Sequence, residues 1–133
     1  QARVMLLAIG LQESRFEYRR QIGDGPAKGF WQFERGGGVK GCISHPASAP
    51  HLRRLCGVRG VDFTPQAAWN AIEADDVLAA GLARLLLWTD PKPLPALGDA
   101  DGAWSLYLRT WRPGKPHLIS WSWVYHQALG AVS

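Results

Sequence analysis

A glutamate near the end of an apolar helix is the first residue in this chain whose setting could support acid–base chemistry. Glu13 follows the apolar run Val4–Leu11 and precedes Ser14 and Phe16. Apolar surroundings disfavour the ionised form of a carboxyl group and raise its pKa, so the group can hold a proton near neutral pH. Such a group could act as a general acid, but a glutamate late on a helix, taken alone, is more often a solvated surface residue, and the segments that follow favour the catalytic role.

Four short segments, in a fixed order, extend the pattern that begins at Glu13. They are Glu13-Ser14-Arg15-Phe16, Gly29-Phe30-Trp31-Gln32, residues 76–88 with an Ala-Gly pair followed by leucines, and residues 106–111 with one tyrosine. In type and order these segments resemble the signatures of the soluble lytic transglycosylase family of the lysozyme superfamily. The resemblance covers about residues 4–34 and 75–115. The fourth segment departs from the family, because Leu108 stands where asparagine is expected.

The resemblance implies that the chain cleaves the β-1,4 bond between N-acetylmuramic acid and N-acetylglucosamine in peptidoglycan. Glu13 would protonate the leaving oxygen and then act as the base, while the sugar's own 6-hydroxyl attacks to give an anhydro product. Hydrolysis, as in a muramidase, would require a second carboxylate. Glu34 is the first candidate, since alternation along a strand from Gln32 would place both side chains on one face. Asp24 and Asp62 are further candidates, and all three also fit surface or turn carboxylates.

The same resemblance implies a set of substrate-binding residues around the acid. Ser14 belongs to the first signature, and the Gln32 amide would exchange hydrogen bonds with an acetamido group of the sugar. Phe30 and Trp31 would offer flat apolar faces to sugar rings, with core packing as the alternative for Trp31. Tyr107 would supply a hydroxyl near the acid. No cofactor and no metal are expected for this reaction.

Residues 42–60 lie outside the resemblance and contain a rival set of ligands. Cys42, His45, His51 and Cys56 supply two sulfurs and two imidazoles among basic residues, as in a nucleic-acid-binding zinc knuckle. The segment has no aromatic residue for base stacking, so we do not expect nucleic acid as a partner. We favour a Cys42–Cys56 disulfide, which would contribute about 3 kcal/mol in an oxidising compartment. Free buried thiols are the other alternative.

Apolar periodicity and capping residues predict a mainly helical chain. Helices are expected over about residues 2–16, 65–73, 75–88, 101–111 and 116–129. Thr64 fits an N-cap, and Asp75 and Asp76 place negative charge where a helix begins. Residues 22–41 hold seven of the fifteen glycines and predict a β-hairpin or an irregular loop, and residues 42–60 predict another loop.

Length and composition favour one folded domain over residues 1–133. The chain has 133 residues, of which 47% are apolar and 20% are charged, as in globular proteins. We expect a mainly α, lysozyme-like fold with a small glycine-rich loop or β-hairpin lobe, and a sugar-binding groove between the lobes. Four tryptophans on helical stripes are assigned to the core, namely Trp69, Trp88, Trp104 and Trp121.

The charge distribution indicates an anionic partner. Residues 1–60 hold ten basic and four acidic side chains, a net charge of +6, whereas residues 61–133 hold five and seven, a net charge of −2. Such an excess would suit the anionic bacterial wall. Arg84 interrupts the longest apolar stretch, so no segment is expected to span a membrane.

The resemblance to the lytic transglycosylase family implies a monomer that is synthesised in the cytoplasm and acts on the cell wall, in the periplasm or outside the cell. A bacteriophage lysis or virion protein, or one module of a larger protein, would have these properties. A non-catalytic wall-binding or structural protein on the same fold is the alternative, and the asparagine replaced by Leu108 is the observation that favours it.

Overall fold

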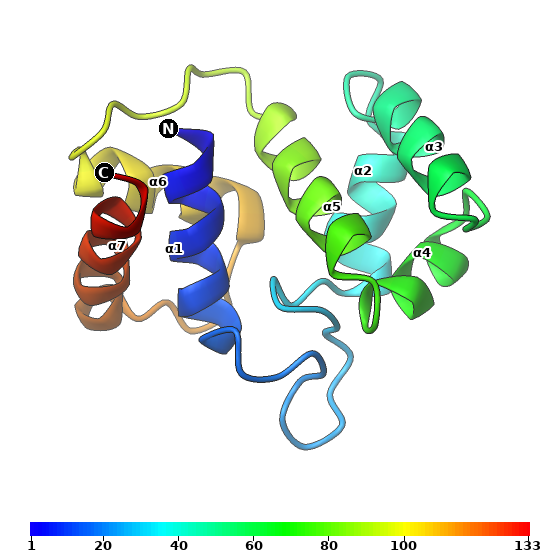
Figure 1. The fold of residues 1–133 in the computed structure, drawn as a ribbon, viewed down its shortest axis with the longest axis horizontal. Coiled ribbons are helices and arrows are strands. Elements are labelled where there is room, and N and C mark those ends of the chain that lie inside the picture. The colour runs from blue at the N-terminus through cyan, green and yellow to red at the C-terminus, as the bar shows by residue number, and fades with distance from the viewer.

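The computed structural model describes all residues 1–133 and consists of helices joined by loops (Figure 1). Seven α-helices and one wide turn follow one another along the chain: α1 (Ala2–Ser14), η1 (Arg35–Val39), α2 (Lys40–Ser44), α3 (Ala49–Val58), α4 (Pro65–Ile72), α5 (Asp76–Trp88), α6 (Ala100–Trp111) and α7 (Leu118–Val132). Pairing between extended segments is limited to two isolated bridges. The mainly α class predicted from the sequence is therefore confirmed.

The helices form two groups that share α5 (Figure 1). Helices α1, α6 and α7 pack together on one side, and α2, α3 and α4 lie on the other. Helix α5 contacts members of both groups. It can do so because small and branched apolar side chains cover much of its surface, and five of its residues are buried: Leu78, Ala79, Leu82, Ala83 and Leu87. The core therefore runs continuously through both groups.

The helix ends follow the capping residues in the sequence. The side chain of Thr64 accepts a hydrogen bond from the backbone N–H of Ala67 at the start of α4, and Asp75 does the same for Leu78 at the start of α5. Helix α1 ends at Ser14 because Arg15 adopts a left-handed conformation, with φ of 56°. The five helices predicted from the sequence are all present, with ends that differ by up to three residues.

The prediction of a loop over residues 42–60 is wrong, because most of this segment is helical. Leu52 and Cys56 lie one turn apart on the buried side of α3, and Cys42 is buried on α2. Ser48 joins the two helices, since its hydroxyl donates a hydrogen bond of 2.6 Å to the carbonyl oxygen of Cys42. Helices of five and ten residues with so few apolar positions give little periodicity, and tertiary burial stabilises them.

The cysteines of this segment are free thiols, so the expected Cys42–Cys56 disulfide is not formed. Both side chains are fully buried. The two histidines of the rival zinc set do not complete a metal site with them: His51 is exposed, and no three His, Cys, Asp or Glu residues gather where they could hold a metal ion. The cysteines contribute to the core as small apolar side chains.

The glycine-rich segment is an irregular loop, one of the two predicted alternatives. Lys28 forms isolated bridges with Arg20 and with Phe33, and η1 bends where Gly37 leaves the helical conformation. Gln32 has a φ of 54°, which no strand residue adopts. The prediction that strand alternation places Gln32 and Glu34 on one face is therefore wrong.

The tryptophans divide between the core and the surface. Trp121 is buried as predicted, and Trp69 and Trp104 pack against the core while partly exposed. Trp88 is 55% exposed at the end of α5, so its assignment to the core is wrong. None of the helices has the length and apolar character that crossing a membrane requires.

Candidate functional site

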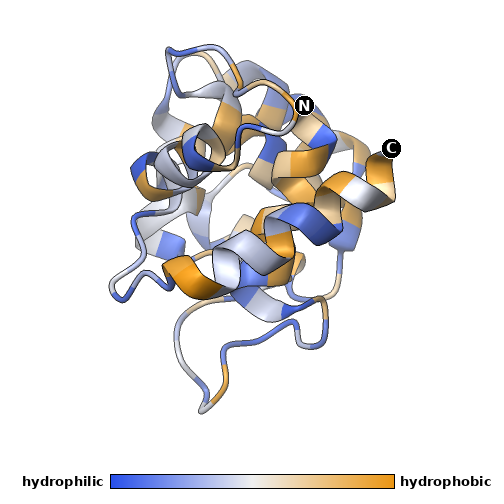
Figure 2. Cartoon of the chain, turned by 90° about the vertical axis from the view of Figure 1, so that its left-hand side faces the viewer, coloured by the Kyte–Doolittle hydropathy of each residue, from blue (hydrophilic) through white to orange (hydrophobic).

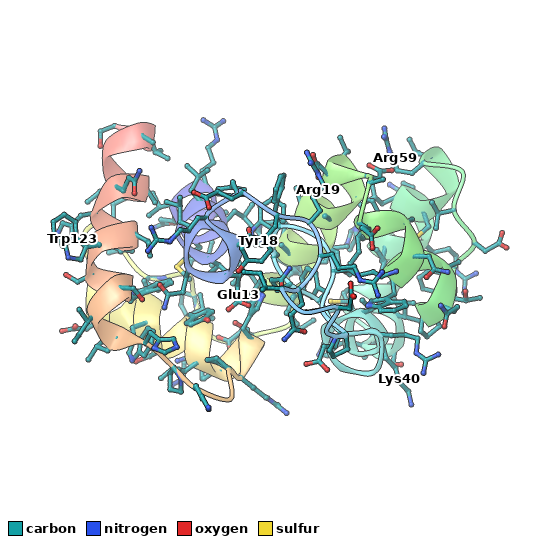
Figure 3. All side chains as sticks on the ribbon, turned by 90° about the horizontal axis from the view of Figure 1, so that it is seen from below. Glu13, Tyr18, Arg19, Lys40, Arg59 and Trp123 are labelled. Carbon is teal, nitrogen blue, oxygen red and sulfur yellow. The ribbon has the colours of Figure 1, made fainter.

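Glu13 lies in the last turn of α1, between the two groups of helices (Figure 3). Its side chain is partly buried, and its carboxylate accepts a hydrogen bond from the hydroxyl of Tyr107 on α6. The carbonyl oxygen of Glu13 accepts a second hydrogen bond, of 3.0 Å, from the hydroxyl of Tyr18. Two tyrosines thus fix the side chain and the backbone of the predicted acid.

The surroundings of Glu13 favour its neutral form. Burial raises the pKa of the Glu13 carboxyl above its ordinary value of 4.5, and the hydrogen bond from Tyr107 offsets part of that increase. Burial and the neighbouring Glu13 carboxylate raise the pKa of Tyr107, which therefore remains a phenol that donates a hydrogen bond. The pair can hold a proton at a carboxyl group in partly apolar surroundings, as proton donation requires.

Tyr107 is held rigidly by aromatic packing between α6 and α7. It is 2% exposed, and its ring stacks on that of Trp121 with centroids 5.0 Å apart and planes inclined by 9°. The indole N–H of Trp121 in turn donates to the carbonyl oxygen of Ala100, at the start of α6. Helix α7 thereby fixes the position of the hydroxyl that meets Glu13.

Ser14 attaches the glycine-rich loop to the end of α1. Its hydroxyl donates a hydrogen bond of 2.6 Å to the carbonyl oxygen of Phe30 and accepts one of 3.1 Å from the backbone N–H of Phe16. Because Ser14 is 1% exposed, it has no surface to offer a ligand. Its predicted role in binding substrate is corrected to a positioning role.

Trp31 belongs to the core, so its predicted role as a wall for sugar rings is wrong. The side chain is 6% exposed, and its indole N–H donates to the carbonyl oxygen of Leu6 in α1. The carbonyl oxygen of Trp31 accepts a hydrogen bond of 2.9 Å from the indole of Trp111. These two hydrogen bonds connect the glycine-rich loop to α1 and to α6.

Phe30 is partly buried, and Arg19 covers one face of its ring. The guanidinium carbon of Arg19 lies 4.4 Å from the ring centroid, and two hydrogen bonds, of 2.9 and 2.8 Å, join this guanidinium to Asp76. The edge of Phe30 meets Phe16, with ring centroids 5.4 Å apart. Only part of the Phe30 ring therefore remains for a ligand.

Gln32 lies at the tip of a tight turn whose base is closed by Lys28 and Phe33. The backbone groups of these two residues exchange hydrogen bonds of 2.9 and 2.8 Å, and the Gln32 amide donates to the carbonyl oxygen of Gly29. Gln32 and Glu34 line one small cavity of about 90 Å³. The structure thus brings these two predicted site residues together, although not through a strand.

A larger groove of about 650 Å³ adjoins this cavity and shares Glu34 and Trp111 with it. The charged and aromatic side chains that line the groove are Glu34, His45, Asp90, Arg109, Trp111 and Arg112. Glu13 itself does not line either space. Tyr107 connects Glu13 to the groove and to the small cavity. Thr110 and Trp111 line both spaces, and they follow Tyr107 by about one turn of α6.

Sequence reasoning missed most of the groove. Asp90 and Arg109 form a bidentate ion pair with distances of 3.1 Å, across a separation of nineteen residues that has no local signature. Trp111 follows Tyr107 by four positions, and that helical spacing is the one signal that could have placed it at the site.

Comparison of the chain with models of protein families, with curated proteins and with solved structures finds no match. The functional assignment therefore rests on the geometry around Glu13 and on the motifs of the sequence.

Proposed function

We propose that this protein cleaves the β-1,4 glycosidic bonds of peptidoglycan, with Glu13 as the proton donor, on a lysozyme-like fold. The observation that carries the proposal is the pairing of Glu13 with Tyr107. Burial shifts the pKa of this carboxyl group in the direction that a general acid needs, and the hydrogen bond from a buried phenol fixes its position at the end of a helix.

In this mechanism the Glu13 carboxyl protonates the oxygen of the scissile bond as the bond to the anomeric carbon breaks. The sugar then carries positive charge in an oxocarbenium-like transition state, and the Glu13 carboxylate that remains serves as the base. It removes the proton from the attacking hydroxyl, which is the sugar's own 6-hydroxyl in transglycosylation. This route requires a single carboxylate.

Hydrolysis is the second route, with Glu34 activating a water molecule. Glu34 is exposed in the groove, where water reaches it freely. An inverting reaction requires the two carboxyl groups to be about 6.5–9.5 Å apart, and a covalent route requires about 5–5.5 Å. The ends of the released fragments distinguish the routes, because transglycosylation leaves anhydro ends and hydrolysis leaves reducing ends.

The groove supports a polymeric substrate with anionic groups. Its volume of about 650 Å³ exceeds what one sugar needs, and Trp111 offers an aromatic surface beside the guanidinium of Arg112, whereas Arg109 is paired with Asp90. The basic excess of residues 1–60 would attract a polymer that carries carboxylates. On this proposal the protein acts as a monomer on the bacterial wall, in the periplasm or outside the cell.

The test is loss of turbidity of purified peptidoglycan sacculi, followed by mass spectrometry of the released fragments. Glu13→Gln keeps the shape and the hydrogen bond from Tyr107 but cannot donate the proton, so activity should fall about 10²- to 10⁴-fold. Asp101→Asn is the control, because this exposed carboxylate lies in the first turn of α6, and its activity should match the wild type.

Two outcomes would contradict the proposal. One is equal activity of Glu13→Gln and the wild type. The other is binding of wild-type protein to sacculi with no released fragments, which would show a non-catalytic wall-binding protein. Leu108, in place of the asparagine of the lytic transglycosylase motif, favours that second function.

A further inference from the structure

An exposed tryptophan on the outer side of α7 lies away from the groove and from Glu13. Trp123 is 78% exposed, and Figure 3 shows it at the edge of the molecule, whereas Glu13 lies between the helix groups. Tryptophan is enriched at binding surfaces, because its ring offers a large apolar face and its N–H can donate a hydrogen bond. The proposed reaction does not use Trp123.

Trp123 borders a depression of about 470 Å³ between α7 and the end of α1. Leu11 and Val124 supply the apolar part of its lining, and Arg15, Glu17 and Gln127 supply polar groups. The left-handed conformation of Arg15 ends α1 here and directs the chain toward Glu17, so the turn itself brings both charges to this depression.

Three polar side chains of this depression have no partners within the protein, whereas the hydroxyl of Ser120, which also lines it, donates to Gln12 and to the carbonyl oxygen of His117. The side chains of Arg15, Glu17 and Gln127 take part in none of the ion pairs or side-chain hydrogen bonds of the structure, whereas Arg19 and Arg59 are paired with aspartates. A guanidinium, a carboxylate and an amide beside an open indole therefore have free hydrogen-bonding capacity.

We propose that this depression is a second glycan-binding site, separate from Glu13 and from the groove that Glu34 and Trp111 line. The apolar face of a pyranose ring would lie on the indole of Trp123. Arg15 and Gln127 would donate hydrogen bonds to ring hydroxyl or acetamido oxygens, and Glu17 would accept them from hydroxyl groups. The identity of the polymer as peptidoglycan rests on the proposed function. Binding here would hold the protein on the wall between cleavage events.

The mixture of groups favours a saccharide over a lipid surface. Ile119, which is 86% exposed, precedes Trp123 by one turn, but the ribbon of α7 in Figure 2 alternates between hydrophilic and hydrophobic residues along its middle part. The opposite charges of Arg15 and Glu17 leave the depression without a net positive charge to attract anionic lipid headgroups, and α7 contains no Lys or Arg. A sugar carries both hydrogen-bond acceptors, which match the guanidinium of Arg15, and hydrogen-bond donors, which match the carboxylate of Glu17.

The experiment measures binding to sacculi in a catalytically inactive background. Glu13→Gln is combined with Trp123→Ala, and sedimentation with purified sacculi gives the dissociation constant. Loss of the indole should weaken binding about 3- to 10-fold, by analogy with other aromatic contacts. The matched control is Glu13→Gln with Trp88→Ala, because Trp88 is also an exposed tryptophan, 55% accessible at the end of a helix, and it should leave binding unchanged.

A soluble probe separates the site from the groove. Chitohexaose, a neutral β-1,4 oligomer of N-acetylglucosamine, should perturb the Trp123 indole N–H signal in NMR spectra of Glu13→Gln, and Arg15→Ala should weaken that perturbation. Equal sacculus binding with and without Trp123 would overturn the inference. So would Trp123-dependent binding to phosphatidylglycerol vesicles with no dependence for sacculi. Failure of cleavage by the wild type would contradict the proposed function and leave these binding results unaffected.

Discussion

The hydroxyl of Tyr107 and the carboxylate of Glu13 meet in a hydrogen bond that spans 94 positions of the chain. One group comes from the end of α1 and the other from the middle of α6, and the stacked ring of Trp121 on α7 fixes the tyrosine. The protonation state of Glu13 therefore depends on how three helices pack. The bond also links the acid to the helix whose next turn lines the groove.

Removing the Tyr107 hydroxyl should shift the pH dependence of cleavage. The hydrogen bond from Tyr107 lowers the pKa of Glu13, against the larger raising effect of burial, so Tyr107→Phe should raise that pKa further. A general acid works in its protonated form, and the alkaline limb of the pH–rate profile should therefore move to higher pH. Loss of a hydrogen bond to a charged group should lower kcat/KM about 10-fold. An alkaline limb that stays in place would show that another group limits the rate at high pH.

The raised pKa of Glu13 should make the wild type less stable as pH rises. The neutral form is favoured in the fold, so the associated stability is fully present below the ordinary Glu value of 4.5 and is lost as pH increases through the raised folded value. Glu13→Gln has no such ionisation. Urea unfolding should give equal stabilities at pH 4 and a more stable variant at pH 8, whereas a constant difference would contradict the raised pKa.

The side chain of Lys28 should stabilise the turn that carries Gln32. Its ammonium lies 3.8 Å from the ring centroid of Trp69 and 3.5 Å from the Glu73 carboxylate, and the side chain is only 10% exposed. Lys28→Met should lower the free energy of unfolding by about 1–2 kcal/mol, since the cation–π contact and the ion pair are both lost. Denaturant unfolding measures the change.

Two further variants check the Lys28 prediction. Lys40→Met removes an exposed lysine from α2 (Figure 3) and should change stability by less than about 0.5 kcal/mol. Adding Glu73→Gln to Lys28→Met should recover part of the loss, because one Glu73 oxygen is buried without a hydrogen bond, and without the ammonium its charge would keep only the more distant Arg20 at 3.7 Å. If the free energy of unfolding does not recover, the loss in Lys28→Met comes from the contact with Trp69 alone.

The two cysteines should react with a thiol reagent only when the protein unfolds. Burial raises the pKa of the Cys42 thiol to about 12, and burial also raises that of Cys56, so little thiolate exists at pH 8. Ellman's reagent, without prior reduction, should find two thiols in guanidinium chloride and almost none in native protein. Zero thiols in the unfolded protein would show that the disulfide expected from the sequence does form.

The ion pair between Asp90 and Arg109 should stabilise the groove in a pH-dependent way. The Arg109 guanidinium lowers the pKa of Asp90, so this stability is present above the ordinary aspartate value of 3.8 and is lost as pH falls through the lower folded value. Asp90→Asn should cost about 1 kcal/mol at pH 7 and much less near pH 2. An equal cost at both pH values would indicate a packing effect. Thermal unfolding of the wild type and of Asp90→Asn at the two pH values measures this loss of stability.

Local signals in the sequence were sufficient to predict the helices that carry Glu13 and Tyr107. Thr64 and Asp75 each cap a helix through a hydrogen bond to a residue three positions on, and such short-range contacts need no tertiary fold. The placement of Glu13 at the end of an apolar helix was visible for the same reason. Its raised pKa was expected from apolar neighbours on that helix.

Tertiary packing decided the rest. Trp31 and Ser14 lie in motifs that predict a binding surface, yet both are buried: Trp31 packs between α1 and α6, and the glycine-rich loop covers Ser14. No local rule contains that information. The left-handed conformation of Gln32 excludes the strand that would have aligned it with Glu34, but an irregular turn still brings both side chains to one cavity. The sequence by itself determined the five helices that have caps or apolar periodicity, and it placed Glu13 near the end of the first one, whereas α2 and α3 depend on tertiary burial. Only the fold determined what surrounds that carboxyl group, because burial and hydrogen bonding there come from residues up to 94 positions away.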